Sequence, residues 1–372
     1  MQALLKKLPC DAQVDVITTM PNRYSSFITE VSEFEQSDRF SIRRIALPAH
    51  HSGMIDQSRA FLSYAVSALN QVRGRKYDLI FATSSRLMTG VLGSLIARWQ
   101  RTRLYLDIRD IFVDTIEDVL SKKSILAIRP VLVRLERFAL MRAQRVNLVS
   151  EGFLDYFQQR YPHLSYSFYT NGVDPEFINK FEASGNAAVE SAGRPLTVLY
   201  AGNIGEGQGL HAIIPRLAEK MGAQVQFRLI GDGGRRSELE RALTASGVHN
   251  VEVTGPVSRS CLIEEYRAAD VLFLHLNDYD AFKKVLPSKI FEYAATGKPV
   301  WAGVSGFSSQ FIKREVQNAA VFESCNVDEA VKVFATLDLV SVSRQDFVRR
   351  FSRDAISSDL AADVLSTAEM NE

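Results

Sequence analysis

Short apolar stretches alternate with longer amphipathic ones along most of the chain, and this alternation is typical of an α/β protein. Segments such as SRAFLSYAVSALNQVRG place apolar residues three and four positions apart, which predicts helices. Strands and helices that alternate in this way form mostly parallel sheets through right-handed crossovers. In the first half, the predicted strands cover residues 14–19, 41–47, 77–83, 103–109 and 145–150.

The alternation is interrupted at the small and polar stretch 180–195, which predicts a linker. The pattern thus predicts two parallel α/β domains and a helical C-terminal segment, with the bounds 1–183, 184–340 and 341–372. We expect the last segment to pack back on the first domain. The second series of predicted strands covers residues 196–202, 225–231, 251–255, 270–276, 299–303 and 319–322.

The first residues, MQALLKKLP, have the pattern of the end of an amphipathic helix. An α/β domain usually begins with a strand, so we expect the first strand of this domain, with its loop, to be missing. The sequence leaves open whether the chain is active without them.

Composition adds mainly exclusions. A net charge of +1 over 372 residues gives no whole-molecule case for a nucleic-acid partner. The three cysteines Cys10, Cys261 and Cys325 are scattered, which argues against a disulfide framework or a zinc site. No apolar run reaches the roughly 18 residues of a membrane span.

The stretch YAGNIGEGQGL, Tyr200–Leu210, follows a predicted strand and precedes a helix. Its glycines allow close backbone approach, and the helix start offers N–H groups to an anion. The glycine spacing does not fit the dinucleotide fingerprint, and the next strand ends in Leu229-Ile230-Gly231 without an acid. A phosphate-facing loop and a plain tight turn both remain open.

The stretch LIGDGGRRSELE repeats the strand–glycine–helix arrangement, with Asp232 in the turn. Asp232 is able to brace the turn or cap the helix. Arg235 and Arg236 lie in the first helical turn, where cations oppose the helix dipole, and their presence indicates a bound anion.

The stretch LPSKIFEYAATGKPVWAG places three polar residues at a helix start. Ser288 is expected to cap the helix, and Lys289 and Glu292, three apart, share one face. Lys289 offers a point charge for a phosphate, and Glu292 offers two acceptor oxygens for a ribose diol. The alternative is an exposed ion pair that contributes about 0.2–0.5 kcal/mol.

In this order and spacing, GNIGEGQG, GDGG, GPV, DVLFLHL and PSKIFEYAATGKPV resemble the donor-binding domain of family-four retaining glycosyltransferases of the GT-B fold. Upstream, YDLIFATSS, LYLDIRD, NLVSEGF and TNGVD are similar to the acceptor half of bacterial members that build surface polysaccharide, such as O-antigen or capsule. The resemblance extends from about residue 14 to 335 and implies two Rossmann-like domains that face each other across a cleft.

The resemblance implies a role for each matching residue. Glu292 would hold the nucleotide ribose, and Lys289 would meet the diphosphate of a nucleotide-diphosphate sugar, with no other cofactor and no metal. Two departures stand out: Lys284 replaces the first glutamate of many members, and Asn203 and Gln208 replace an Arg and a Lys. The other expected donor contacts are Gly202, Asn203, Gly205, Gly231, Asp232, Gly233, Val257, Lys284 and Ser288.

The stretch LDIRDIFVD places Asp107, Arg109 and Asp110 at a strand end in the first domain. We expect Arg109 to meet the leaving phosphate, and Asp110, or with less support Asp107, to orient the acceptor hydroxyl. The alternative is that these Arg–Asp pairs only tie loops together.

Two motifs resemble metal sites without the right context. Asp278-Tyr279-Asp280 imitates a DxD pair, but a GT-B enzyme needs no metal, so we expect a solvated loop. His50-His51 lack a third ligand at a recognisable spacing, and a sugar contact is the remaining option.

The segment 122–145 is basic and amphipathic, with Glu136 as its one acid. It is suited to an anionic membrane leaflet, and equally to an internal helix with a solvated basic face. We therefore expect a cytoplasmic protein with peripheral membrane contact.

The sequence thus predicts a retaining, metal-independent glycosyltransferase. It would move a sugar from a nucleotide-diphosphate donor to a hydroxyl of a lipid-linked glycan in surface polysaccharide biosynthesis. The alternative is a catalytically inactive relative that acts as a binding protein in a polysaccharide assembly complex, which Lys284 favours. The donor base, the sugar, the acceptor and the oligomeric state are not encoded in any recognisable motif.

Overall fold

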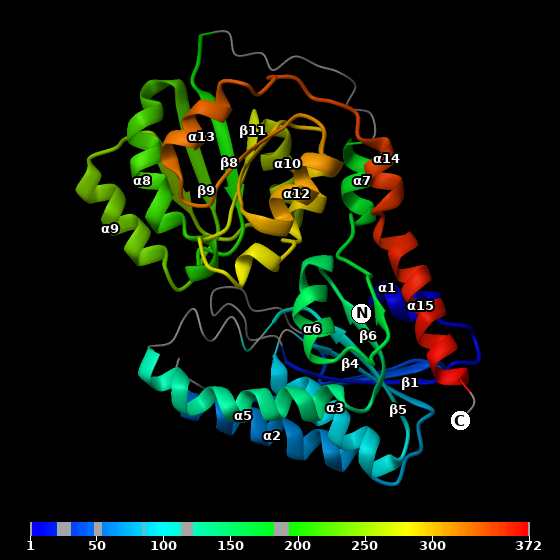
Figure 1. Cartoon of the computed structure of the whole chain (residues 1–372). Coiled ribbons are helices and arrows are strands. Elements are labelled where there is room, and N and C mark those ends of the chain that lie inside the picture. The colour runs from blue at the N-terminus through cyan, green and yellow to red at the C-terminus, as the bar shows by residue number, and fades with distance from the viewer. Residues whose placement is uncertain are drawn as a thin grey trace.

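The computed structural model describes residues 2–20, 31–47, 54–84, 86–111, 113, 122–181 and 193–370. Within these ranges, the side chains of 54, 55, 57, 84 and 122–127 are not described. The described strands form three sheets in two Rossmann-like units (Figure 1). The predicted boundary at residue 183 lies outside the described residues.

The C-terminal unit has a six-stranded parallel sheet in the order β10-β9-β8-β11-β12-β13. The strand order reverses between β8 and β11, and open sheets of this kind bind ligands at the carboxyl ends of the strands beside such a switch point. The strands are β8 (Leu196–Ala201), β9 (Val225–Ile230), β10 (Val251–Thr254), β11 (Val271–His275), β12 (Val300–Gly303) and β13 (Ala319–Phe322).

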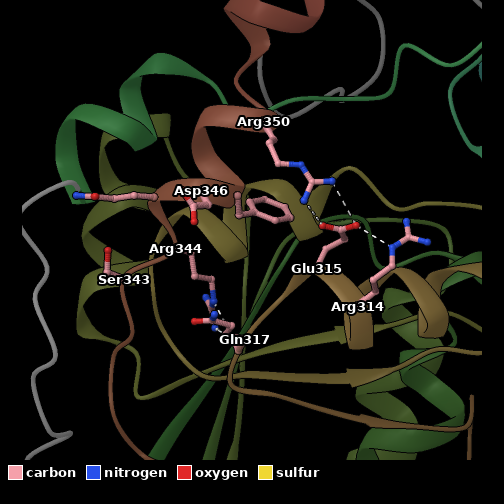
Figure 2. Close-up of a pocket in the computed structure, with 9 residues that line it drawn as sticks. Arg314, Glu315, Gln317, Ser343, Arg344, Asp346 and Arg350 are labelled. Atoms are coloured by element: carbon pink, nitrogen blue, oxygen red, sulfur yellow. Dashed lines mark hydrogen bonds and ion pairs between the residues drawn. The ribbon is translucent and has the colours of Figure 1, made fainter.

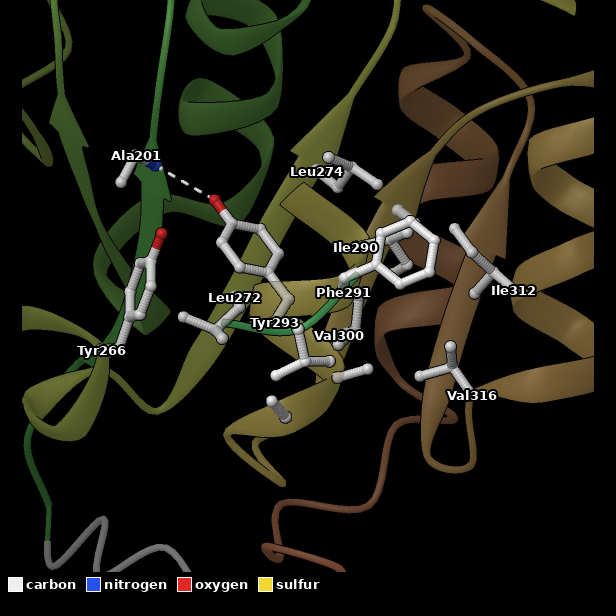
Figure 3. Close-up of a cluster of buried hydrophobic side chains, with 14 of the residues drawn as sticks. Ala201, Tyr266, Leu272, Leu274, Ile290, Phe291, Tyr293, Val300, Ile312 and Val316 are labelled. Atoms are coloured by element: carbon white, nitrogen blue, oxygen red, sulfur yellow. Dashed lines mark hydrogen bonds between the residues drawn. The ribbon is translucent and has the colours of Figure 1, made fainter. Parts of the chain in front are cut away.

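Helices cover both faces of this sheet, which explains why its central strands are almost continuously apolar. One face packs against α8, α9 and α13, and the other packs against α10, α11 and α12. Figure 3 shows part of the second interface, where the N–H of Ala201 donates to the hydroxyl of Tyr293 at 3.1 Å. The helices are α8 (Leu210–Met221), α9 (Arg236–Ser246), α10 (Arg259–Ala268), α11 (Lys289–Ala295), α12 (Gly306–Glu315) and α13 (Val327–Phe334).

The N-terminal unit contains two sheets. Four parallel strands lie in the order β4-β5-β6-β7, and a separate sheet has the order β1-β3-β2, with β2 antiparallel to β3. All eleven predicted strands are confirmed, within two residues at each end, but β2 and β7 were not expected. The strands are β1 (Val14–Thr19), β2 (Phe34–Gln36), β3 (Phe40–Ile45), β4 (Leu79–Ser84), β5 (Arg103–Ile108), β6 (Ala143–Leu148) and β7 (Tyr166–Ser167).

Three helices, α2 (Met54–Val72), α3 (Leu87–Gln100) and α5 (Lys122–Leu140), lie side by side against the N-terminal sheets (Figure 1). We call them the outer helix layer. Ser94 Oγ of α3 donates to Phe138 O of α5 at 3.1 Å, and Gln100 Nε2 donates to Val72 O of α2 at 3.1 Å. Among the described residues, every helix is too short or too polar to cross a membrane.

The chain passes between the two units twice, and the two crossings lie side by side. Val173 N donates to Phe351 O at 2.7 Å, and Arg353 N donates to Val173 O at 2.9 Å. After the first crossing, α7 packs against the core of the C-terminal unit; after the second, α15 packs against α1 and β5 of the N-terminal unit. The remaining helices are α1 (Gln2–Lys7), α6 (Leu154–Arg160), α7 (Pro175–Phe181), α14 (Gln345–Arg350) and α15 (Arg353–Glu369).

Candidate functional site

Three polar side chains meet near the loop that follows β8, and we call them the Lys–Glu–Tyr cluster. Lys289 Nζ lies 2.8 Å from Glu292 Oε2, and the hydroxyl of Tyr266 donates to the same oxygen at 3.0 Å. Lys289 Nζ also donates to the Tyr266 hydroxyl at 3.2 Å. Lys289 Cε would lie 3.7 Å from a Cβ at Gly202, so the cluster adjoins the carboxyl end of β8.

The burial of this cluster sets its chemistry. The side chains of Lys289 and Glu292 are 28% and 17% exposed, so the pair is not the fully exposed one of the alternative interpretation. Tyr266 is fully buried, and burial, with the nearby Tyr293 and Glu292, raises its pKa well above 10. Its hydroxyl therefore keeps its proton and donates to Glu292. Among the described residues no hydrogen bond reaches Glu292 Oε1, which leaves that oxygen as an acceptor for a ligand.

Arg259, at the start of α10, links this cluster to the first crossing between the units. Its guanidinium donates to Glu176 Oε2 at 2.7 Å and to Asp174, and it lies 4.9 Å from the ring centroid of Phe177. Burial lowers the pKa of Arg259, but the carboxylates of Glu176, Asp174 and Glu292 outweigh this effect and raise it.

Sequence reasoning missed Tyr266 and Arg259. Both belong to α10, more than twenty residues before Glu292 along the chain, and no local spacing relates them to it. The only signal was the GPV loop, Gly255–Val257, which ends two residues before Arg259.

The two glycine loops pack backbone against backbone. A Cβ at Gly231, where φ is +154°, would lie 1.8 Å from Gly202 O, and a Cβ at Gly233, where φ is +159°, would lie 2.5 Å from Ile204 O. Ile204 N also donates to Asp232 O at 2.8 Å. Both glycines are therefore required for close approach of the loops, whether or not a ligand is present.

Polar side chains fix the first loop further. Asn203 Nδ2 donates to Gln208 Oε1 at 2.8 Å across Gly205, and the hydroxyl of Tyr200 donates to Asn203 O at 2.6 Å. The two residues that replace an Arg and a Lys of the family pattern thus bond to each other. In the second loop, Gly233 N donates to Asp232 Oδ1 at 2.8 Å, so Asp232 braces its own turn.

The two arginines after the second loop have carboxylate partners. Arg235 pairs with Glu206 and Glu238, and Arg236 Nε lies 2.9 Å from Glu240 Oε1. The hydrogen bond from Tyr279 and the pairing with Arg235 lower the pKa of Glu206, although burial opposes this. These ion pairs account for both arginines, so their position at a helix start is no longer an indication of a bound anion.

The prediction that Ser288 caps α11 is wrong. Its backbone is already helical, with φ −60° and ψ −26°, whereas a capping side chain needs an extended backbone, and its side chain makes no cap hydrogen bond. Val257, another expected donor contact, is 36% exposed and directly precedes Ser258, whose hydroxyl accepts the N–H of Cys261 and caps α10.

Lys284 lies where the two units touch. It ends the 3₁₀ turn η4 (Phe282–Lys284), and its carbonyl accepts a 2.6 Å hydrogen bond from Ser150 Oγ of the N-terminal unit. Its Nζ is 5.5 Å from the ring centroid of Tyr156 in α6. The structure thus places Lys284 against the N-terminal unit, and no described contact joins it to the Lys–Glu–Tyr cluster.

In the N-terminal unit, Asp107 is buried at the end of β5 and both of its oxygens are engaged. Oδ2 accepts from Thr83 Oγ1 at 2.7 Å and from Arg109 Nε at 2.9 Å, and Oδ1 accepts from Asn147 Nδ2 at 2.7 Å. Asp107 is therefore better suited to orient Arg109 than to meet an acceptor. Arg109 Nη1 in turn donates to Asn171 Oδ1 at 3.1 Å, beside the first crossing.

Asp110 is half-buried and lines a small cavity between β4, β5, α3 and α5. The cavity is mostly apolar, but Arg86 and the buried Glu136 also reach it. Glu136 accepts hydrogen bonds from the hydroxyls of Tyr156 and Tyr161, each at 3.0 Å. Asp110 thus lies in a different setting from Arg109, although the two are adjacent in sequence.

His275, at the end of β11, was not expected to matter. Its Nδ1 lies 2.6 Å from Gln208 O, and its Nε2 accepts the N–H of Cys325 at 3.0 Å. These partners assign the proton to Nδ1 in the neutral ring. Burial is the main cause that lowers the pKa of His275, to about 4, so the ring is neutral at pH 7 and ties the first glycine loop to the end of β13.

The remaining motifs lie apart from the cluster. Asp278 and Asp280 both face Lys283, at 3.7 and 2.8 Å. Within the described part of the chain, no three His, Cys, Asp or Glu side chains converge as metal ligands would. His50-His51 and Asp114 lie outside the described residues, as do the side chains of 122–127 in the basic segment.

A polar cavity of about 380 Å³ lies near the amino end of β13, away from the glycine loops (Figure 2). Arg344, 6% exposed, donates there to the carbonyls of Gln317, Ala294 and Lys298 at 2.6 to 3.2 Å. Arg314 and Arg350 flank Glu315, which pairs with both. These contacts tie the connection before α14 to the sheet and do not form part of the candidate site.

Comparison with known proteins gives matches to two family models. The model for the glycosyl transferase 4-like domain matches residues 5–163, and the model for glycosyl transferases group 1 matches residues 186–350. The chain is also 31% identical over 100 residues to WcaI of Escherichia coli strain K12, whose name assigns it as a colanic acid biosynthesis glycosyl transferase. That match spans 27% of this chain and only 24% of WcaI.

Solved structures of the same architecture cover most of the chain. Sucrose-phosphate synthase from Thermosynechococcus elongatus has a TM-score of 0.71 and 14% identity over 98% of this chain and 90% of that one. A UDP-forming trehalose-phosphate synthase from Burkholderia xenovorans, in complex with glucose-6-phosphate, has a TM-score of 0.68 and 13% identity over 97% of this chain and 94% of that one. Alr3699/HepE from Anabaena, in complex with UDP and glucose, has a TM-score of 0.63 and 19% identity over 87% of this chain and 86% of that one. At these identities the likeness concerns the fold.

Proposed function

Because this chain belongs to the GT-B glycosyltransferases, with a glycosyl transferase 4-like domain followed by a group 1 domain, we propose that it transfers a sugar from a nucleoside diphosphate to a hydroxyl of a glycan acceptor. In this proposal the C-terminal unit holds the donor. The N-terminal unit holds the acceptor, whose hydroxyl Asp110 orients, while Arg109 of the same unit faces the departing phosphate.

The observation that carries the proposal is the Lys–Glu–Tyr cluster beside Gly202. It places a cation and a carboxylate with one unengaged oxygen next to the loop after β8, at the switch point of the sheet. Lys289 is able to exchange its contact with Glu292 for a phosphate oxygen, since an ammonium group has three donors. Glu292 Oε1 then accepts from the ribose hydroxyls, while Tyr266 keeps Oε2 in place.

We propose a retaining reaction without a metal ion. Lys289 and the N–H groups of the first loop would stabilise the negative charge that develops on the departing diphosphate. Arg109, held by Asp107, would supply further positive charge from the opposite unit. The bond from the anomeric carbon to the donor phosphate breaks, and the bond to the acceptor oxygen forms on the same face of the sugar. The departing phosphate oxygen takes the acceptor proton, and the enzyme contributes mainly alignment of the two substrates.

The chemical nature of the acceptor and the cellular location of the reaction are also proposals. WcaI is named for colanic acid biosynthesis, and we propose that this chain extends a lipid-linked glycan of a surface polysaccharide at the cytoplasmic face of the membrane. The departures at Asn203, Gln208 and Lys284 support the second candidate, an inactive binding protein in a polysaccharide assembly complex.

Calorimetric titration with UDP and GDP tests the donor site, followed by turnover with a panel of nucleotide sugars. We expect one nucleoside diphosphate to bind, and Glu292→Ala and Lys289→Ala each to reduce turnover by about two orders of magnitude or more. The matched control is the exposed i,i+3 pair on α14, where Arg349→Ala and Asp346→Ala should leave turnover unchanged.

Two results would count against the proposal. Near-normal turnover in both cluster variants would remove the donor-site assignment. Absence of binding to either nucleoside diphosphate, in a chain whose unfolding is cooperative, would favour the inactive binding protein.

A further inference from the structure

The outer helix layer carries large apolar side chains on its solvent side. Among the described residues, ten large apolar side chains stand out as exposed, and six of them belong to this layer or to the residue that directly follows α5. Their exposed fractions run from 43% to 62%. The six are Leu62 and Val66 of α2, Leu95 and Trp99 of α3, Val131 of α5, and Met141.

The spacing of these residues puts them on one side of the layer. Leu62 and Val66 are four residues apart on α2, and Leu95 and Trp99 are four apart on α3, so each pair forms one stripe. The opposite faces of the helices are buried: Ala68 of α2 and Ile96 of α3 pack together against the sheets. A Cβ at Gly93 of α3 would lie 2.6 Å from Ala82 Cβ of β4, so α3 is pressed closely onto the sheet.

The charge on this side is almost entirely positive. The three helices contain only two acidic residues, Asp56 and Glu136. Glu136 is 4% exposed and is engaged by two tyrosine hydroxyls inside the unit, so it adds nothing to the surface. Besides Arg86, which reaches the inner cavity, the exposed arginines of the layer and of the residues that directly flank it are Arg59, Arg73, Arg98, Arg101, Arg129, Arg134, Arg137 and Arg142.

We propose that the outer helix layer is a docking face for a bilayer of anionic phospholipid. Apolar side chains separated by arginines suit such a surface, because the apolar groups enter the acyl boundary while the guanidinium groups reach the phosphates. A protein partner would instead favour a contiguous apolar centre depleted of charge. The indole of Trp99 is of the type enriched at membrane–water interfaces.

The docking face is broader than the basic segment that the sequence singled out. The segment 122–145 contributes Val131 and Met141 at one edge, while α2 and α3 supply the other four apolar side chains. The inference deepens the proposed function, since a lipid-linked acceptor would reach the N-terminal unit from this surface. Its test does not use the donor site, so the two proposals fail separately.

The test is co-sedimentation of the full chain with sonicated vesicles of phosphatidylcholine, with or without phosphatidylglycerol. We expect binding only to the anionic vesicles, weakened by salt. Arg98→Gln with Arg134→Gln should reduce the partition coefficient by about 25-fold, at about fivefold for each arginine. Arg241→Gln with Arg349→Gln, the same charge change on exposed arginines elsewhere, should leave it unchanged.

Tryptophan fluorescence gives a second readout, because the chain has only two tryptophans. Trp301 is fully buried, whereas Trp99 is 53% exposed. Anionic vesicles should shift the emission to shorter wavelength, and Trp99→Phe, which keeps an aromatic ring, should abolish the shift while vesicle binding persists.

Three results would overturn the proposal. One is equal partition onto neutral and anionic vesicles, or onto neither, at low salt. Another is a concentration-dependent dimer in solution in which Trp99 becomes protected without vesicles. The third is binding of an oligonucleotide with higher affinity than the vesicles through the same two arginines. Donor binding measured on the same variants should be normal in each case, which separates loss of docking from loss of function.

Discussion

Two carboxylates, Asp107 near the end of β5 and Glu292 in the first turn of α11, differ in how many of their oxygens accept hydrogen bonds. Asp107 is 1% exposed and accepts three hydrogen bonds through both oxygens. Glu292 is 17% exposed, and both of its described hydrogen bonds go to Oε2. The same chemical group is thus part of the fold in one unit and open to a ligand in the other. Unused hydrogen-bonding capacity, and not residue type, distinguishes the candidate site.

Substitution of each carboxylate by alanine should give the largest effects, on turnover for Glu292 and on the free energy of unfolding for Asp107. Glu292→Ala should lower turnover by about 10²–10³-fold, because a contact to the donor is lost. Its free energy of unfolding should fall by only about 1 kcal/mol, because Lys289 remains partly solvated and the buried hydroxyl of Tyr266 alone loses its acceptor. Turnover is measured with the identified donor and unfolding with urea.

Asp107→Ala should instead lower the free energy of unfolding by about 2–4 kcal/mol, because Thr83 and the buried Asn147 lose their acceptor. If the Asp107 variant unfolds like the parent chain but loses turnover, the division between the two carboxylates is wrong.

His275 extends the comparison to another buried and fully engaged side chain, whose pKa is lowered by burial. Its pKa is about 4 in the folded chain and near 6.5 when unfolded, so the unfolded state binds a proton first as the pH falls. The contribution of His275 to the free energy of unfolding is therefore fully present above about pH 6.5. It decreases by about 3 kcal/mol as the pH falls to 4.

Urea unfolding at a series of pH values measures this slope. His275→Gln should have a lower free energy of unfolding at pH 7. Between pH 4 and 6.5, the slope of its unfolding free energy against pH should be smaller by the equivalent of about one bound proton. An unchanged slope in the variant would assign the pH dependence to other groups.

Removal of one hydroxyl should sharpen the account of Glu292. Tyr266→Phe removes the donor that holds Oε2, and we expect the KM for the donor to rise about five- to tenfold, the equivalent of one hydrogen bond, with a smaller change in kcat. Tyr161→Phe is the matched control, since its hydroxyl also donates to a buried glutamate, Glu136, far from the site. An equal change in KM for both variants would reduce Tyr266 to a structural role.

The smallest effect should come from Arg236. Its pair with Glu240 is an i,i+4 contact on the side of α9, and Arg236→Gln should change the free energy of unfolding by less than about 0.5 kcal/mol. Nucleotide affinity, measured by calorimetry, should stay within about twofold. A tenfold loss would restore the earlier interpretation of this arginine as an anion ligand.

The fold was accessible from sequence because its signals are local. Apolar stretches of four to seven residues located every strand of the C-terminal sheet, and the signal was clearest for β11 and β12, which are buried on both faces. The three-residue strand β2 was missed because all of its side chains are exposed and no apolar alternation marks it. The first crossing was also missed, because α7 packs on a sheet whose first strand comes only after the linker.

The candidate site was accessible only in part. Lys289 and Glu292 were found because a spacing of three residues puts them on one helix face. Tyr266 and Arg259 came from α10, and only the packing of α10 against α11 brings them to Glu292. The cap at Ser288 was predicted wrongly because residue type suggests a cap while backbone conformation decides it. Whether Asp107 was engaged also depended on Asn147, forty residues away.

The paired crossings at Val173 and Phe351 have a mechanical consequence. Because both connections meet at one isolated β-bridge, between Val173 and Ser352, the second connection adds little restraint beyond the first, and we expect any rotation between the units to be hinged there. A rotation about that bridge would leave each unit intact and would break contacts between the units that lie away from it, such as the hydrogen bond from Ser150 Oγ to Lys284 O. Admission and release of a molecule would then require one small rotation and no rearrangement inside either unit.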